Sequence, residues 1–242
     1  MVKKIEGIIV SEVDYKESSK IINIYTNEYG IIGVLARGAK RLKSSLSGVT
    51  SKLTYGYFYL NYKENGLSIL TEVDVIESFK NIKRDLQKIS YASFLTELAT
   101  QVYRHENSNN IYEIYLSGLK KINDNLDPMV IVNIIELKLL NNLGIKPVID
   151  SCVSCDNTDV VTISSYKGGL LCKNCLGSEK IVHSKTIELI RLFYYVDISK
   201  IDKIEISDAI KKEINEFVDD YYDRYSGLYL KSKQFLKNIT KV

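Results

Sequence analysis

The stretch LSILTEVDVIESFKNIKRDLQKISYASFLTELATQVYRH, residues 67–105, changes its hydrophobic pattern near residue 80. Its first part is short and rich in β-branched residues, a composition typical of a strand. In its second part apolar residues recur at helical spacing and form one stripe, composed of Ile82, Leu86, Ile89, Phe94, Leu98 and Val102. The stretch therefore predicts an α+β fold in which strands come before helices.

Four similar runs lie upstream and predict strands at 7–13, 20–26, 31–38 and 53–62, with 67–79 as the fifth strand. The turn KENG at 63–66 separates the last two runs and predicts a hairpin. Five short strands fit a small closed barrel of the OB type better than a sandwich, which uses about seven strands. We therefore expect residues 1–80 to form an OB-fold domain.

Residues 81–242 are expected to form a helical domain, with helices near 81–105, 111–122, 127–144, 184–195 and 207–225. The helix in DPMVIVNIIELKLLNNLG has clear ends, because Asp127 suits the N-cap, Pro128 the first turn and Gly144 the C′ position. The helix at 207–225 is expected to direct one apolar face toward a core, formed by Ile210, Ile214, Phe217, Val218 and Tyr221.

The only four cysteines of the chain form two pairs, CVSC at 152–155 and CKNC at 172–175. The spacing C-x2-C-x16-C-x2-C is typical of a structural zinc site, in which each pair occupies a tight turn. We therefore predict one structural Zn²⁺ per chain, bound by Cys152, Cys155, Cys172 and Cys175 in a zinc ribbon inserted at about 149–178. Two disulfides or four free thiols are the alternatives, which such pairs in a cytosolic-looking chain disfavour. Four sulfur ligands leave no open position for water, so the site favours a structural role over hydrolysis.

No arrangement of residues predicts a catalytic site. The two histidines, His105 and His183, have no neighbours that would make a nucleophile or a metal-ligand pattern, and each is interpreted as a surface or helix-end residue. The pair Gly168-Gly169 lacks the Lys-Ser/Thr ending of a phosphate-binding loop and is interpreted as a hairpin turn. The acids in DDYYD, residues 219–223, are interpreted as a solvated helix face. Catalytic arrangements are therefore hard to find in this sequence.

The charge of the chain is small overall but unevenly distributed. The formal net charge is +3, yet no acid occurs between Glu28 and Glu64, where the six cations are Arg37, Lys40, Arg41, Lys43, Lys52 and Lys63. A second run without acids follows Asp223 and contains Arg224, Lys231, Lys233, Lys237 and Lys241. Such asymmetry is typical of a protein that binds a polyanion. No apolar run approaches the roughly 18 residues of a membrane-spanning helix, so we expect a cytoplasmic protein without a membrane partner.

Several motifs together carry a resemblance to a known family. The segment DYKESSKIINIYTNEYGIIGVLARGAKRLKSSLSG, the helix end IELKLLNNLGIKP, the pairs CVSC and GGLLCKNC, and the terminal YLKSKQFL closely resemble the RecO family of bacterial recombination mediators over nearly the whole chain. The resemblance implies binding of single- and double-stranded DNA, annealing of complementary strands, and location near the nucleoid. It also implies that the protein is not an enzyme. It also implies three protein partners, namely RecR, RecA indirectly, and single-strand-binding protein, whose acidic, apolar-ended C-terminal tail the helical domain would bind. Because some members of that family lack the cysteines, the zinc prediction rests on the spacing in this chain.

The basic loop ARGAKRLKSSLSG, residues 36–48, follows the third predicted strand. OB folds bind single strands by pairing a basic groove with aromatic side chains, so Arg37, Lys40, Arg41 and Lys43 are the predicted DNA-binding residues. In LTYGYFYLNY, alternation places Tyr55, Tyr57 and Tyr59 on one face, which is either packing surface or a platform for bases, and Phe58, Leu60 and Tyr62 on the other. A zinc-ribbon factor acting on RNA or in transcription, and a hydrolase, remain as alternatives.

Overall fold

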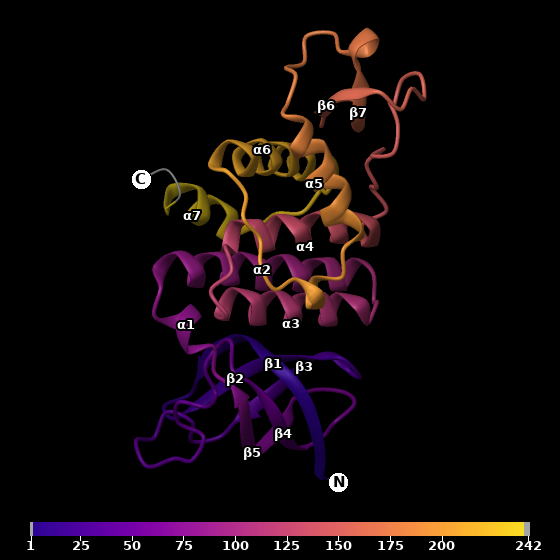
Figure 1. The fold of residues 1–242 in the computed structure, drawn as a ribbon. Coiled ribbons are helices and arrows are strands. Elements are labelled where there is room, and N and C mark those ends of the chain that lie inside the picture. Colours follow the sequence, from indigo (N-terminus) through magenta and orange to yellow (C-terminus); the bar gives the residue numbers. More distant parts are fainter. Residues whose placement is uncertain (1, 240–242) are drawn as a thin grey trace.

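A computed structural model of the chain describes residues 2–239, and within the last helix it describes side chains as far as Leu236. Residue 1, at the start of the first predicted domain, and residues 240–242, at the end of the second, lie outside the described residues; Lys241 is among them. Figure 1 shows a β-barrel at one end of the molecule, stacked helices in the middle and a small hairpin at the opposite end. The fold is thus α+β, in the order that the change of hydrophobic period predicts.

Five strands close into a barrel in the order β1-β2-β3-β5-β4, and they are β1 Val2–Tyr15, β2 Ser19–Thr26, β3 Gly30–Ala36, β4 Tyr55–Asn61 and β5 Ser68–Glu77. All pairings are antiparallel except the parallel contact between β3 and β5 that closes the barrel. The predicted OB-type barrel is confirmed. β1 starts earlier than the predicted residue 7, because its first residues pair with the end of β4, beginning with Val2 opposite Asn61.

The interior of the barrel is filled by alternate residues of its strands. Phe58 and Leu60 of β4 point inward and are fully buried, so the predicted alternation along this strand is confirmed. Ala39 and Leu46 join the same core from the connection between β3 and β4. This connection is therefore packed against the barrel, although its sequence reads as a basic loop.

Seven α-helices follow within the described residues: α1 Lys80–Lys83, α2 Leu86–His105, α3 Asn110–Asn123, α4 Pro128–Asn142, α5 Ser184–Tyr195, α6 Asp208–Tyr225 and α7 Lys231–Ile239. The prediction of one continuous helix over 81–105 is wrong. The helix breaks at Asp85, whose side chain caps α2 by accepting a hydrogen bond from the Lys88 backbone N–H at 3.0 Å. Leu86 is consequently the first residue of α2 and is 64% exposed, so it does not belong to the buried stripe.

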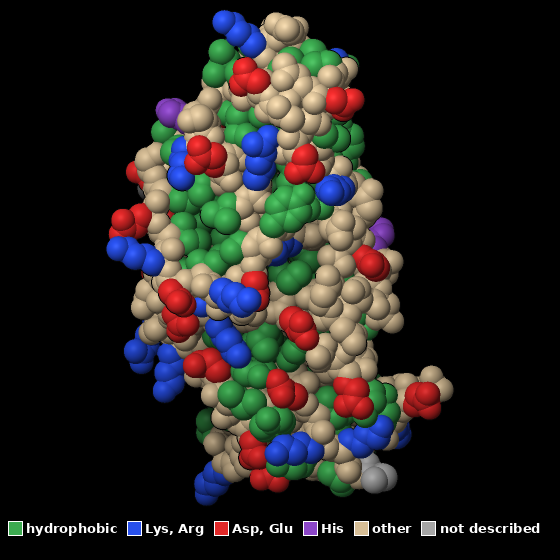
Figure 2. Space-filling model, turned by 45° about the vertical axis from the view of Figure 1, so that its right-hand side comes forward, with side chains coloured by type: hydrophobic (Ala, Val, Ile, Leu, Met, Phe, Trp, Pro, Cys, Tyr) green, Lys and Arg blue, Asp and Glu red, His purple; other side chains and the backbone are tan. Residues whose placement is uncertain are grey.

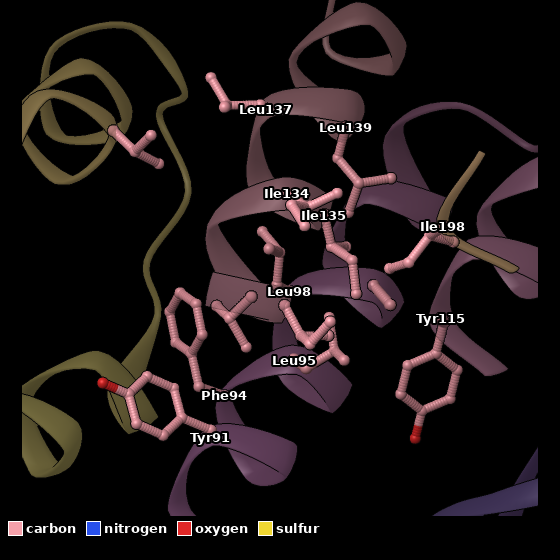
Figure 3. Close-up of a cluster of buried hydrophobic side chains, with 14 of the residues drawn as sticks. Tyr91, Phe94, Leu95, Leu98, Tyr115, Ile134, Ile135, Leu137, Leu139 and Ile198 are labelled. Atoms are coloured by element: carbon pink, nitrogen blue, oxygen red, sulfur yellow. The ribbon is translucent and has the colours of Figure 1, made fainter. Parts of the chain in front are cut away.

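Helix α4 lies at the centre of the helical domain. Asp127 accepts hydrogen bonds from Met129 N–H and Val130 N–H, Pro128 occupies the first turn, and Gly144 has a φ of +69°, as the predicted ends require. Helices α2, α3, α5 and α6 all contact α4, and Figure 3 shows its isoleucines meeting Leu95 and Leu98 of α2. A helix buried on all sides has an apolar sequence around its circumference, which explains the run VIVNIIELKLL.

The barrel and the helices share one hydrophobic core, which includes an aromatic cluster at their junction. Tyr25 of β2 is fully buried, and its ring centroid lies 4.9 Å from that of Tyr103 and 5.3 Å from that of Tyr112. Gly30 lies beside this cluster with a φ of +63°, a conformation that favours glycine, and a Cβ there would stand 1.9 Å from the Tyr103 hydroxyl oxygen. Such packing orients the barrel relative to the helices.

Helix α7 was not predicted, because tertiary contacts define it. The Glu97 carboxylate of α2 accepts hydrogen bonds from the backbone N–H groups of Lys231 and Ser232 and thereby caps the first turn of α7. Lys233 forms ion pairs of 2.6 Å with Asp219 and 2.5 Å with Asp223.

Two cations of the second basic run, Arg224 and Lys233, are therefore paired with the acids of 219–223. Arg224 pairs with Asp220 at 2.8 Å, in addition to the ion pairs of Lys233. The acids of 219–223 lie on a partly solvated helix face, as interpreted, but they also pair with Lys233 and Arg224, so the interpretation of the run after Asp223 as wholly unmatched charge is corrected. The Lys237 side chain and Lys241 lie outside the described part of the chain.

Candidate nucleic-acid interface and metal centre

The basic loop after β3 displays its four predicted DNA-binding cations to solvent. Arg37, Lys40, Arg41 and Lys43 are all exposed. The two apolar anchors of the loop, Ala39 and Leu46, are buried in the barrel core, which orients the intervening charges outward. The predicted residues are thus brought together at one end of the barrel.

The start of the loop is fixed to the turn between β1 and β2. Lys40 N–H donates to the Ser18 carbonyl oxygen at 3.0 Å, and Gly38 N–H donates to the Ser19 hydroxyl at 3.3 Å. Gly38 has a φ of +68°, a conformation that favours glycine, and this lets the chain turn at that point. The cations therefore project from a segment held by backbone hydrogen bonds.

One of the four cations is paired with an acid. Lys40 Nζ lies 2.6 Å from an Asp14 carboxylate oxygen of β1, and the hydrogen bond from Lys40 lowers the pKa of Asp14. Among the side chains that the structure describes, Arg37, Arg41 and Lys43 have no ion-pair partner. Three of the four cations thus carry uncompensated positive charge.

A groove of about 550 Å³ lies between the loop and the β1–β2 turn. Tyr15 and Lys16 line one side, Arg37 and Arg41 line the other, and Leu35 contributes apolar surface. The sequence analysis did not single out Tyr15 or Lys16. Strand pairing could have predicted their position: when β2 pairs with both β1 and β3, the turn YKESS between β1 and β2 must lie beside the end of β3.

The remaining cations and tyrosines of the barrel have other surroundings. Lys52 lies between the barrel and the helices, where burial lowers its pKa although Glu97 opposes the shift. Tyr57 and Tyr59 stand opposite Asp74 and Glu72 of β5, whose carboxylates would repel a phosphate backbone. Figure 2 likewise shows a face on which acidic and basic side chains are interspersed over barrel and helices.

The four cysteines converge at the end of the molecule farthest from the barrel (Figure 1). Their sulfur atoms all lie within 4.8 Å of one another, and Cys155 Sγ and Cys172 Sγ are 3.6 Å apart. No disulfide joins them. Zn–S bonds of about 2.3 Å in a tetrahedron place sulfurs about 3.8 Å apart, so the donor set and its spacing fit zinc.

Burial and backbone hydrogen bonds oppose each other at Cys152. Burial favours its thiol, but N–H groups of Cys172, Ser154 and Cys155 lower the pKa of Cys152 to about 6. A turn whose amides converge on a sulfur is the local geometry that a metal-binding thiolate needs.

The cysteine hairpin consists of β6 Val160–Ser164 and β7 Gly169–Cys172, followed by the short 3-10 helix η1 Lys173–Cys175. Gly168, with a φ of +81°, lies in the turn between the strands, as predicted. At Gly169 a Cβ would stand 2.3 Å from the Val148 carbonyl oxygen, so the hairpin can pack there only with glycine.

Side chains of α5 and α6 contact the cysteine insertion, α5 at the segment before the hairpin and α6 at the hairpin turn. Arg191 of α5 donates to the Ile149 carbonyl oxygen at 2.7 Å and to the Asp150 carbonyl oxygen at 3.1 Å. Tyr225 of α6 donates to the Tyr166 carbonyl oxygen at 3.1 Å. These contacts tie the cysteine hairpin to the helical domain.

The histidines lie where the sequence analysis expects them. His105 is the exposed last residue of α2, and His183 precedes α5, with Nδ1 2.8 Å from a Glu213 carboxylate oxygen. Glu213 also accepts hydrogen bonds from His183 N–H and the Thr186 hydroxyl, so the cluster fastens α5 to α6. Within residues 2–239, no helix is both long and apolar enough to cross a bilayer.

Comparisons with known proteins agree with this architecture. The family model described as Recombination protein O N terminal matches residues 1–79, and Recombination protein O C terminal matches residues 83–234. The chain is 39% identical to a protein of Halalkalibacterium halodurans named DNA repair protein RecO, over 99% of this chain and 96% of the relative. Proteins of the same name from Listeria monocytogenes serotype 4b and Bacillus pumilus are 36% identical, over 99% of this chain and 95% of each relative.

Proposed function

The chain belongs to the RecO family of DNA repair proteins, whose members are recombination mediators and not enzymes, and we propose that it anneals DNA strands during repair. In this proposal it binds single- and double-stranded DNA through its barrel and anneals complementary strands coated by single-strand-binding protein. With RecR, it then helps to load RecA onto the DNA. The observation that carries the proposal is the set of three exposed, unpaired cations on the basic loop of an OB barrel, two of which, Arg37 and Arg41, line a groove.

The proposed DNA contacts are Arg37, Arg41 and Lys43, with Lys40 as a weaker contact because Asp14 already neutralises it. Phosphate recognition needs only positive charge and reach, which exposed side chains on an anchored loop provide. The neighbouring groove adds the aromatic surface that OB folds use for single strands. Binding of this kind is tolerant of sequence, as annealing of arbitrary strands requires.

We further propose that residues 1–80 are the DNA-binding domain, and that 81–242 form a helical domain with a metal-binding insertion at about 149–178. One Zn²⁺, held by Cys152, Cys155, Cys172 and Cys175, would cross-link the two cysteine turns. When bound, the ion supplies a closed four-sulfur centre without an open ligand position. Its role is therefore to stabilise the cysteine insertion that α5 and α6 contact.

For coated strands, we propose that the helical domain recruits single-strand-binding protein through its C-terminal tail. The carboxylates of such a tail need Lys or Arg, and its terminal apolar side chain needs a groove between helices. Arg191 is engaged by backbone carbonyl oxygens of the cysteine insertion, and Lys138 donates to the Tyr194 carbonyl oxygen. We therefore assign no residue to this contact.

Strand annealing on bare and on coated DNA tests the proposal. The protein should anneal complementary strands without ATP in both cases, and deletion of the tail from the single-strand-binding protein should abolish annealing only on coated strands. Rising salt should weaken the contact with the tail. Failure to anneal bare strands would refute the function, whereas full-rate annealing on strands coated by the tail-less protein would refute recruitment alone.

A further inference from the structure

The groove beside the basic loop has two kinds of surface. Its rim is cationic, with Lys16 on the side of the β1–β2 turn and Arg37 and Arg41 on the side of the loop. Its lining also includes an aromatic residue, Tyr15, and an aliphatic one, Leu35. A purely electrostatic contact with a phosphate backbone does not require a concave site with aromatic and aliphatic lining.

Hydrogen bonds and an ion pair tie together the two segments that flank the groove. Lys40 N–H donates to the Ser18 carbonyl oxygen of the β1–β2 turn, Gly38 N–H donates to the Ser19 hydroxyl at the start of β2, and Lys40 pairs with Asp14 of β1. The volume of about 550 Å³ falls within the range of roughly 300–1,000 Å³ typical of small-ligand sites. A ligand group can therefore enter without separating the loop from the turn.

The aromatic surface is available to a ligand. Tyr15 is 38% exposed although it lies on a strand. Lys16 Nζ lies over its ring, 5.5 Å from the centroid, so a base would stack on the ring surface that Lys16 leaves uncovered. No acid is among the lining residues: Glu17 lies between the lining residues Lys16 and Ser18 but does not itself line the groove, and Asp14 is paired with Lys40. A negatively charged ligand group therefore lies near cations on both sides of the groove, and a flat ring of the ligand can stack on Tyr15.

We propose that this groove is a subsite for an unpaired nucleobase of single-stranded DNA, with the Tyr15 ring as its stacking platform and Lys16, Arg37 and Arg41 around the flanking phosphates. The inference rests on the proposed DNA binding by the barrel. A base within a duplex is stacked on its neighbours and cannot enter the groove. The subsite thus makes the protein favour single strands, the substrate of annealing, beyond what charge alone provides.

Equilibrium binding of full-length protein to two short strands tests the subsite. The probes are an oligothymidylate of about eight nucleotides and an abasic strand of the same length, which carries the same phosphates without bases. Tyr15→Ala should weaken oligothymidylate binding by about 5-fold to 150-fold, the range of one lost base–aromatic stack. It should leave binding of the abasic strand unchanged.

Matched variants separate stacking from other effects. Tyr15→Phe keeps the ring and should retain oligothymidylate affinity, whereas Tyr229→Ala, which removes a 70% exposed tyrosine of the helical domain, should change neither probe. Arg41→Ala removes a phosphate contact and should weaken both probes by the same factor.

The outcomes separate the nucleobase subsite from the proposed DNA-binding surface as a whole. If Arg41→Ala weakens both probes but Tyr15→Ala weakens neither, or weakens both equally, the nucleobase subsite is wrong and the proposed DNA surface stands. If neither Arg37→Ala nor Arg41→Ala affects either probe, the proposed surface itself is wrong. Tyr15→Phe binding as poorly as Tyr15→Ala would also overturn stacking, because the ring would not be the group that matters.

Discussion

The ion pair between Lys40 and Asp14 predicts that the four cations of the basic loop are not equivalent. Arg37, Arg41 and Lys43 carry free charge, whereas Lys40 Nζ lies 2.6 Å from the Asp14 carboxylate. The informative changes are therefore Lys40→Ala, Arg41→Ala as its unpaired counterpart on the same loop, and Asp14→Asn, which removes the partner and retains Lys40.

The salt dependence of DNA binding gives the expected size of these effects. Each phosphate contact on a single strand contributes about 0.7 to the slope of log affinity against log salt. Replacing all three unpaired cations by Ala should thus lower the slope by about 2. Arg41→Ala alone should reduce the magnitude of the slope by about 0.7, and Lys40→Ala should reduce it by less. Asp14→Asn should increase the magnitude by up to about 0.7, because it frees Lys40 for a phosphate.

Fluorescence titration of a labelled single strand at several salt concentrations measures these slopes. Circular dichroism of each variant is the control for folding, which exposed loop residues should not disturb. Equal losses for Lys40→Ala and Arg41→Ala would refute the reasoning, because the ion pair would then not withdraw Lys40 from DNA. An unchanged slope in the triple variant would mean that the loop is only a solvated surface.

Three further predictions concern the metal and the core. Cys152→Ser should abolish stoichiometric zinc and loosen the adjoining helices, and protein purified under reducing conditions without chelator should contain zinc by elemental analysis; its absence would contradict the metal assignment. Burial raises the pKa of Glu136 from 4.5 to about 8. Between pH 4.5 and pH 8 the Glu136 carboxyl is therefore ionised in the unfolded state but protonated in the native state, so the free energy of unfolding falls as pH rises. Glu136→Gln should therefore stabilise the protein by roughly 3 kcal/mol at pH 7 and by little near pH 4.5, and a urea-unfolding difference that does not grow with pH would disprove this. Tyr25→Phe removes a buried hydroxyl without a partner and should raise stability by about 1 kcal/mol, whereas Tyr115→Phe breaks a 2.9 Å hydrogen bond to Thr96 and should lower it by about as much; equal effects in thermal unfolding would contradict this contrast.

Local patterns in the sequence determined the architecture. The β-rich runs before residue 80 correspond to strands of the barrel, and the helix beginning at Asp127-Pro128 and ending before Gly144 has its predicted ends. The cysteine spacing likewise predicts the converging sulfurs. These features depend on residues close together in the chain, where backbone geometry and side-chain period limit the possible structures.

The state of the charges was decided by tertiary structure. Lys40 and Asp14 are 26 residues apart in the chain, and β1 and the basic loop must pack before these two side chains can meet. A count along the sequence therefore presents the loop as uniformly unpaired.

The same holds for the C-terminal run, where Lys233 finds Asp219 and Asp223 only after α7 docks on the helical domain. That docking depends on Glu97, which caps α7 from 134 residues away. Coulomb energy and hydrogen bonding depend on distance in space and not on separation along the chain. For this reason the sequence predicted which elements form, whereas only the folded chain determined which cations remain free for DNA and where a groove opens beside them.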